Sequence, residues 1–278
     1  MENYFTKEQE KKIIDLYVNQ KRGQLYCAKA VGSTNIKKVK EVLYKYNIPI
    51  RNFSEAASCS NRNRALNKNK EYFSFQSHNM TWLLGFLASD GSVSSSDNTI
   101  KIGLSAKDKE ILEKIKNEVE IENKIVEYTT NNGFDCVDLH WTCKEHKEEL
   151  AKYGITSKKT FTIKPPINLE SKYYIDFIRG YFDGDGSVNL LHSNKKIVGL
   201  RWQICSATQE ILEWIVDVLE KQYNVPKVKV YKDNIRSNYY YFQYSTQSTK
   251  LIYNILYTPN SLFLKRKKDH FDKIIQMK

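Results

Sequence analysis

Two aspartates in this sequence each end an apolar segment and are each followed by Gly-Ser-Val. Asp90 lies in LLGFLASDGSV (residues 83–93), and Asp185 lies in FIRGYFDGDGSV (residues 177–188), 95 positions later. If each segment is a helix, its carboxylate lies at the negative end of the helix dipole, where it gains least from its own helix. Two such acids brought together repel each other unless a cation lies between them. The pair therefore predicts a divalent-metal site.

We call the acidic ends of the two segments, at Asp90 and Asp185, the tips. Calcium binding of the EF-hand type does not account for the second tip. The position that needs the loop glycine is Val188, and the position of the closing glutamate is Asn194. A glycine-capped turn facing solvent would be the simpler explanation of a single copy. Because the tip occurs twice, the metal site is favoured.

A second candidate metal site lies in FDCVDLHWTCKEH, residues 134–146. Zinc would need four converging side chains. The stretch alternates like a β-strand, so Cys143 points with the apolar side chains, away from Cys136 and His140. We therefore expect a half-buried strand here, and not a zinc site made of Cys136, His140, Cys143 and His146.

The composition indicates a polyanionic partner. The 278 residues carry 44 Lys and Arg against 32 Asp and Glu, a formal net charge of +12. No segment approaches the ~18 consecutive apolar residues of a membrane span, so nucleic acid is favoured over a membrane. Five scattered cysteines form no disulfide framework, which is typical of a reducing, cytoplasmic location. We expect a bacterial, phage or organellar compartment that contains DNA.

The chain after residue 71 repeats itself, and the repeat predicts the fold class. Each tip leads into an alternating strand, TIKIGLSAKD or LRWQICSATQ, and then into a helix, two more strands and a closing helix. We predict an α+β fold of two pseudo-symmetric αββαββα halves, residues 72–165 and 166–278, with antiparallel, saddle-shaped sheets. The closing helices are expected at about 144–153 and 247–257.

Residues 1–50 predict a separate all-α module. Thr6 and Gln9 form a capping box for a first helix, a short second helix ends at a glycine turn, and Ser33 or Thr34 caps a third, lysine-rich helix. Its buried stripe is predicted to run from Ile36 to Tyr46. This order matches a DNA-binding helix-turn-helix; a three-helix interaction bundle with a solvated lysine face is the alternative. Residues 51–71 indicate a basic linker that would track phosphates, and a merely flexible tether is the alternative. The DNA contacts expected from both segments are Asn35, Lys37, Lys38, Arg51, Arg62 and Arg64.

The two tips and the elements after them resemble the LAGLIDADG homing endonucleases in their single-chain, two-motif form, over roughly residues 75–278. The resemblance implies that the two motif helices pack side by side, with Gly85 and Gly180 at their contact. It also implies that Asp90 and Asp185 are catalytic and hold Mg²⁺, with Mn²⁺ or Ca²⁺ able to substitute for binding. The carbonyls of Ser89 and Gly184 would complete the metal site, and Lys159 and Lys267 would be the catalytic lysines. The neighbouring Lys158, Lys265 and Lys268 are the alternatives in register, and a plain basic surface is the alternative for any one of them. Asp183 has no acidic counterpart in the first copy and is not counted as catalytic.

The implied function is site-specific hydrolysis of double-stranded DNA at a long target, by a monomer, leaving short 3′ overhangs. The alternative is a non-cleaving nucleic-acid binder on the same scaffold, such as an intron maturase or a transcription regulator. The wet faces of the strands would contact DNA, although each position singly could be a solvated strand residue. These residues are Lys101, Ser105, Asp138, His140, Arg201, Gln203, Lys227, Lys229, Tyr231 and Gln243.

Overall fold

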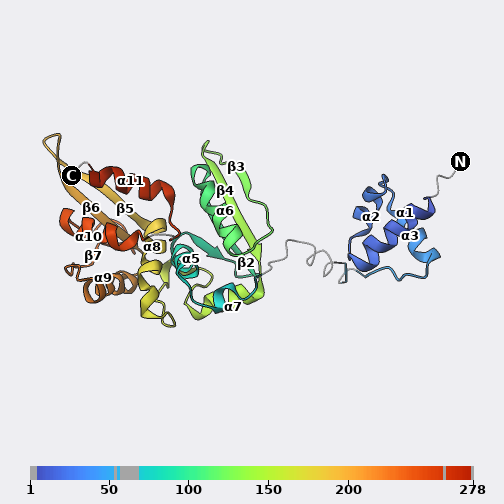
Figure 1. The fold of residues 1–278 in the computed structure, drawn as a ribbon, viewed down its shortest axis with the longest axis horizontal. Helices are drawn as coiled ribbons and strands as arrows, with labels where there is room; N and C mark the ends of the chain where they lie inside the picture. The colour runs from blue at the N-terminus through green and yellow to red at the C-terminus, as the bar shows by residue number, and fades with distance from the viewer. Residues whose placement is uncertain (1–4, 53–54, 57–68, 259–260, 277–278) are drawn as a thin grey trace. The chain divides into compact units, whose positions relative to one another are not determined.

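A computed structural model describes residues 5–52, 55–56, 69–258 and 261–276. The chain divides into two compact units, Met1–Leu66 and Asn67–Lys278 (Figure 1). Arg62 and Arg64, with most of the predicted linker, lie outside the described residues. Among the residues that are described, none of the helices is both long enough and apolar enough to span a bilayer.

The first unit is helical and has its own small core. Its elements are α1 (Lys7–Ile14), the π-helical turn η1 (Asp15–Asn19), α2 (Gln24–Ala30) and α3 (Ile36–Lys45). Ile13, Val39 and Leu43 are fully buried in its core. The capping box of Thr6 and Gln9 is present as predicted.

Two details of α3 differ from the sequence expectation. Its N-cap is Asn35, whose side chain accepts hydrogen bonds from the backbone N–H groups of the first turn. Ser33 instead accepts from the Asn35 N–H, because the turn at Gly32 (φ +75°) carries the chain one step further before the helix begins. Ile36 and Tyr46 are 36% and 44% exposed, so the buried stripe is narrower than predicted.

The second unit contains two halves of the same order, and the predicted α+β class is confirmed. The first half consists of η2 (Tyr72–Ser74), α5 (His78–Ser89), β1 (Gly91–Val93), β2 (Thr99–Ser105), η3 (Ala106–Asp108), α6 (Lys109–Glu118), β3 (Val126–Thr129), β4 (Asp135–Thr142), α7 (Lys144–Lys152) and η4 (Lys159–Phe161). The second half consists of η5 (Ser171–Tyr173), α8 (Tyr174–Asp185), β5 (Gly186–Ser193), β6 (Lys196–Ser206), α9 (Gln209–Tyr223), β7 (Tyr231–Lys232), β8 (Tyr240–Tyr244), α10 (Thr246–Leu256) and α11 (Lys265–Gln276).

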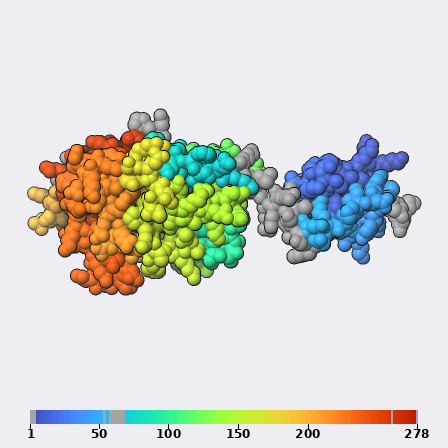
Figure 2. Space-filling view, turned by 90° about the horizontal axis from the view of Figure 1, so that it is seen from below, coloured from blue at the N-terminus to red at the C-terminus, as the bar shows by residue number. Residues whose placement is uncertain are grey.

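Both sheets are antiparallel and have the same strand order, β1-β2-β4-β3 and β5-β6-β8-β7. Their dry faces carry the alternating apolar residues that the sequence predicts, among them Ile102, Trp141, Trp202 and Ile204, all fully buried. The two halves form one continuous body, the second half in orange beside the first half in cyan to yellow-green (Figure 2). One hydrophobic cluster runs through both halves.

Helix α11 is an addition that the repeat does not predict. The sequence KRKKDHFDKIIQ looks like a basic surface segment, yet Phe271 and Ile274 are buried one helical turn apart. The helix packs on β5 of its own half (Figure 1). It brings the basic run 265–268 back to the centre of the unit.

The two motif helices α5 and α8 touch through their backbones. A Cβ built on Gly85 would lie 2.0 Å from the carbonyl oxygen of Phe177, and one on Gly180 would lie 1.9 Å from the carbonyl oxygen of Trp82. No side chain larger than hydrogen fits at either position without separating the helices. Side chains above and below complete the contact, including the stacked rings of Trp82 and Phe86.

Replacing Gly180 by Ala is expected to lower the free energy of unfolding of the second unit by about 3 kcal/mol, because backbone atoms of α5 would have to move. Denaturant unfolding followed by tryptophan fluorescence measures this unit alone, since all four tryptophans lie after residue 67. Gly133→Ala is the control: its Cβ meets nothing within 4 Å, and only its positive φ opposes the change, at about 1 kcal/mol. A loss at Gly180 no larger than at Gly133 would contradict the tight contact.

Candidate active site

The close packing of α5 and α8 brings their acidic tips together. A Cβ on Gly184 would lie 1.9 Å from Ser89 Oγ and 3.3 Å from the carboxyl carbon of Asp90. Asp90 caps the end of α5, and Asp185 is the last residue of α8. Two carboxylates 95 positions apart in the sequence therefore lie close together in the structure.

Each helix passes almost directly into a strand. Only Asp90 separates α5 from Gly91 at the start of β1, and Asp185 at the end of α8 is followed at once by Gly186 at the start of β5. A Cβ at either glycine would lie 2.7 Å from the carbonyl oxygen of the residue four positions earlier. The glycines therefore permit a sharp helix-to-strand junction that leaves each acid at the boundary between core and sheet.

One lysine from each half binds the carbonyls of its own tip. Lys159 Nζ donates to the backbone oxygens of Ser89 and Gly91, on either side of Asp90. Lys267 Nζ donates to the oxygens of Phe182 and Gly184, each at 2.7 Å. Neighbouring lysines go elsewhere: Lys265 pairs with Asp269 and Lys268 with Asp272. Of the described lysines in these two runs, Lys159 and Lys267 are the ones given hydrogen bonds to the carbonyls of the tips.

The acids and lysines of the tips are all held away from their usual pKa values. Loss of solvent contact, reinforced by the charge of Asp90, raises the pKa of Asp185 to about 6. Desolvation also raises the pKa of Asp90, against the opposing effect of the two lysines. Burial lowers the pKa of Lys267 to about 8 and lowers that of Lys159. The site therefore disfavours the charged form of all four side chains. A bound cation would favour the charged form of the two carboxylates.

The donor set at the tips fits a hard divalent cation. It comprises two carboxylates, Asp90 and Asp185, and the carbonyl oxygens of Ser89 and Gly184, each with a second lone pair besides the one used by a lysine. Mg²⁺ is typically held by one or two carboxylates together with water and substrate phosphate. Within the described ranges, no group of three or more His, Cys, Asp and Glu residues could hold a metal ion, so any further ligands would be water or substrate.

A hollow of about 380 Å³ leads from the tips to the first sheet. Its lining includes Asp90 and Gly184 of the tips and Lys101 and Asp138 of the first sheet. Lys101 Nζ lies 2.6 Å from an Asp138 oxygen, so these two predicted DNA contacts neutralise each other on the sheet. His140 and Ser105 are exposed on the same face.

On the second sheet the predicted contacts fall into two groups. Gln203 and Gln243 face each other across β6 and β8, and Tyr231 stacks on Tyr241 with ring centroids 5.7 Å apart. Arg201 is half-buried and Lys229 is exposed. Lys227, in contrast, lies against α9, where it pairs with Asp217 at 2.6 Å. It is not a wet-face residue, because β7 begins only at Tyr231.

In the first unit, two predicted DNA contacts are used within the fold. The Asn35 side chain caps α3. The Arg51 guanidinium donates to three carbonyl oxygens of residues 17–22 and lies 3.8 Å from the centre of the Tyr17 ring. Lys37 and Lys40 remain exposed on α3. Lys38, half-buried, lies on the same helix.

The Cys/His stretch packs as a strand and a helix start. His146 is fully buried, accepting a hydrogen bond from Trp141 Nε1 at 3.0 Å, with its other ring nitrogen 2.8 Å from the carbonyl oxygen of Asn69. Burial lowers the pKa of His146, so a neutral ring links β4, α7 and the chain that enters the unit. Cys143 is buried with the apolar side chains, as the strand alternation predicts.

Two features of the site are not visible in the sequence. Asp183 is buried and accepts hydrogen bonds from Trp82 Nε1 and from the backbone N–H of Leu264. Asp108, also buried, holds Arg266 of α11 in a two-armed ion pair. No local pattern signals these contacts, since the partners Leu264, Trp82 and Arg266 are 81, 101 and 158 positions away along the chain.

The geometry defines a class of fold: a duplicated αββαββα unit whose two packed helices each end at an acidic residue. Residues 77–161 match the family model described as a LAGLIDADG-like domain. This match lies in the first half of the second unit, and it agrees with the resemblance that the sequence shows.

Individual relatives are distant. A protein of Methanocaldococcus jannaschii described as uncharacterized is 23% identical over 192 residues, 66% of this chain and 66% of that protein. The DNA-directed RNA polymerase subunit Rpo1C of the same organism is 26% identical over 155 residues, 55% of this chain but only 17% of the subunit. The chain thus spans just under two thirds of the first relative and a small part of the second.

Among solved structures, LAGLIDADG meganuclease I-AabMI bound to uncleaved DNA is similar at 13% identity, with a TM-score of 0.47 over 70% of this chain and 90% of that one. The homing endonuclease I-WcaI bound to its DNA recognition sequence is 12% identical, with a TM-score of 0.47 over 81% of this chain and 96% of that one.

Replacing Asp185 by Asn is expected to stabilise the metal-free second unit by about 1–3 kcal/mol at pH 7.5. The folded pKa of about 6 exceeds the ordinary value of 3.8, so ionising this carboxyl lowers stability as pH rises through that window. The gain should shrink between pH 6 and 4 and vanish below. Tryptophan-monitored unfolding at several pH values measures it.

Millimolar MgCl₂ should stabilise the wild type more than Asp185→Asn, because only a ligand of the folded state raises stability. Asp269→Asn, which breaks an exposed ion pair, is the control and should change stability by less than about 1 kcal/mol at every pH. A pH-independent gain for Asp185→Asn would refute the electrostatic origin.

Proposed function

We propose that this chain is a site-specific, metal-dependent endonuclease that cuts both strands of a DNA duplex, with Asp90 and Asp185 as its metal-holding acids. The observation that carries the proposal is the double set at the tips, one acid with one carbonyl-bound lysine from each half. Two equivalent sets related by the repeat suit two scissile phosphates on antiparallel strands. The formal charge of +12 and the family match support a DNA substrate.

In this mechanism the chain's own groups bind, orient and move protons. Asp90 and Asp185, with the carbonyls of Ser89 and Gly184, would hold Mg²⁺. When bound, such a cation supplies a polarised phosphoryl oxygen, a water of lowered pKa and charge neutralisation at the leaving oxygen. The ammonium groups of Lys159 and Lys267 would donate hydrogen bonds to phosphate oxygens. With a pKa near 8, Lys267 Nζ could also exchange a proton with water near neutral pH.

Asp90→Asn and Asp185→Asn are each expected to abolish double-strand cleavage while DNA binding is retained, because the amide keeps the shape but loses the charge that holds the cation. The substrate is obtained by selecting cleaved sites from a randomised DNA pool in the presence of Mg²⁺. Cleavage is then read on gels and binding by fluorescence anisotropy in Ca²⁺.

Asp269→Asn should cut like the wild type. If both tip variants still cut both strands, the assignment of the acids is wrong. If the wild type binds DNA and cuts none, the chain is a non-cleaving binder.

We further propose that the first unit adds contacts to the DNA through α3. Replacing Lys37 and Lys40 together by Ala should weaken binding and reduce the slope of log affinity against log salt by about 2, since each phosphate contact releases about one counterion. The cleavage rate at saturating DNA should not change. Lys114→Ala, an exposed lysine paired with Glu110 on α6, is the control; an equal effect there would show only a general loss of charge.

A further inference from the structure

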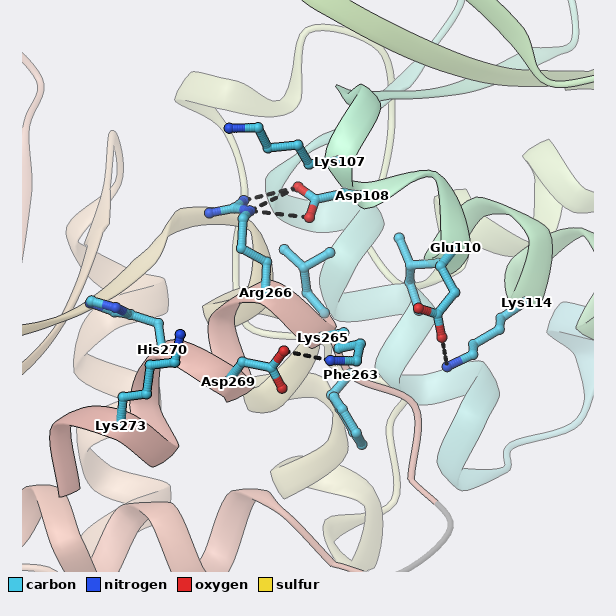
Figure 3. Close-up of a pocket in the computed structure, with 12 residues that line it drawn as sticks. Lys107, Asp108, Glu110, Lys114, Phe263, Lys265, Arg266, Asp269, His270 and Lys273 are labelled. Carbon is cyan, nitrogen blue, oxygen red and sulfur yellow. Dashed lines mark hydrogen bonds and ion pairs between the residues drawn. The ribbon is translucent and has the colours of Figure 1, made fainter. Parts of the chain in front are cut away.

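The first turn of α11 is held by two buried aspartates that come from different halves. Asp183 of α8 accepts a hydrogen bond from the Leu264 N–H at 2.9 Å. Asp108, at the end of η3 in the first half, is 5% exposed and accepts from the Arg266 guanidinium at 3.0–3.1 Å. Figure 3 shows this ion pair at the top of a hollow of about 450 Å³ between α6 and α11.

These anchors determine where Lys267 lies. Leu264, Arg266 and Lys267 belong to one helical turn, closed by hydrogen bonds from the N–H groups of Lys267 and Lys268 to the Leu264 oxygen. From that turn Lys267 Nζ reaches the Phe182 and Gly184 oxygens of the tip. Because Arg266 precedes Lys267 directly on this turn, the ion pair with Asp108 restrains the backbone from which the Lys267 side chain extends.

A weaker contact of the same kind runs from the second half to the first. Thr208, just before α9 in the second half, occupies the place that Asp108 has before α6. Its hydroxyl donates to the Ile163 oxygen at 2.8 Å. Ile163 follows η4, the turn that carries Lys159, and its N–H bonds to the Lys159 oxygen. Each half thus holds the lysine-bearing segment of the other half, a contact that we call a brace. The first half does so through the Asp108–Arg266 ion pair, and the second half through the neutral Thr208–Ile163 hydrogen bond.

We infer that Asp108 is a positioning residue for Lys267 and Thr208 for Lys159, so that each half sets the lysine serving the opposite half and its DNA strand. This inference rests on the proposed endonuclease function. The two braces differ in strength, since a two-armed hydrogen-bonded ion pair orients its partner more strongly than a single neutral hydrogen bond. Loosening one brace should therefore slow one strand only.

The test is strand-resolved cleavage of a duplex labelled differently on its two strands, with Lys267→Ala and Lys159→Ala identifying which strand depends on which lysine. Asp108→Asn should slow the Lys267-dependent strand about tenfold or more, so that nicked duplex accumulates, while the dissociation constant for DNA stays unchanged. Thr208→Val should slow the other strand, by a smaller factor of at least about two.

Asp108→Asn is preferred to Arg266→Ala as the test variant. The amide removes the buried charge and leaves Arg266, whose side chain is 54% exposed, to be hydrated. Arg266→Ala would instead leave a buried carboxylate without its partner and could unfold the unit. Asp269→Asn, which breaks an exposed ion pair on the same helix, is the matched control and should cut both strands at the wild-type rate.

A second measurement needs neither metal nor cleavage. In the metal-free protein, hydrogen exchange of the Leu264, Lys267 and Lys268 amides should be faster in Asp108→Asn than in the wild type or in Asp269→Asn. The inference is overturned if Asp108→Asn slows both strands equally, if Thr208→Val slows the same strand, or if this exchange is unchanged. A wild type that cuts neither strand would overturn the proposed function instead, and the exchange would still decide whether Asp108 anchors α11.

Discussion

The backbone contact between α5 and α8 is the constraint on which the second unit depends. At Gly85 and Gly180 the carbonyl of each helix occupies the space where the other would carry a Cβ. Each sheet is joined directly to one of these helices, since β1 and β5 begin at the residue after Asp90 and Asp185. The distance between the two acids is therefore set by main-chain contact and not by flexible side chains, and main-chain contacts yield little.

That constraint forces unfavourable electrostatics at the tips. Asp90 and Asp185 are brought together in partial isolation from water, and two lysines are placed beside them under the same desolvation. The lysines offset part of the repulsion between the acids and satisfy the carbonyls at the helix ends. The fold accepts the remaining cost because a large common core supports both helices. Sites of this kind exchange stability for the ability to bind a charged ligand.

Local sequence patterns were enough to predict the framework of this structure. The repeat gave the strand alternation, and Ile102, Trp202 and Ile204 lie on the dry faces as alternation requires. The Thr6–Gln9 box is local and was predicted correctly. The choice of Lys159 and Lys267 among neighbouring lysines came from family resemblance; the structure places both beside the tips, and their catalytic role stays a prediction. The contacts that the patterns could not predict are made with residues far away in the sequence. Nothing in the basic run around Arg266 indicates its ion pair with Asp108. Lys227 lies against α9 because it pairs with Asp217 there.

The junction of helix and strand at each tip has a consequence for how the molecule could change. The strands expected to read DNA follow the acid at each tip along the backbone, since the glycine directly after each acid begins the first strand of each sheet. Substitution of side chains along β2 or β6 can alter which bases are preferred without altering the junction. Under the proposed function, the position of the cut relative to the recognised bases would be set by the backbone, so descendants of this chain could change their targets while keeping the same cutting offset.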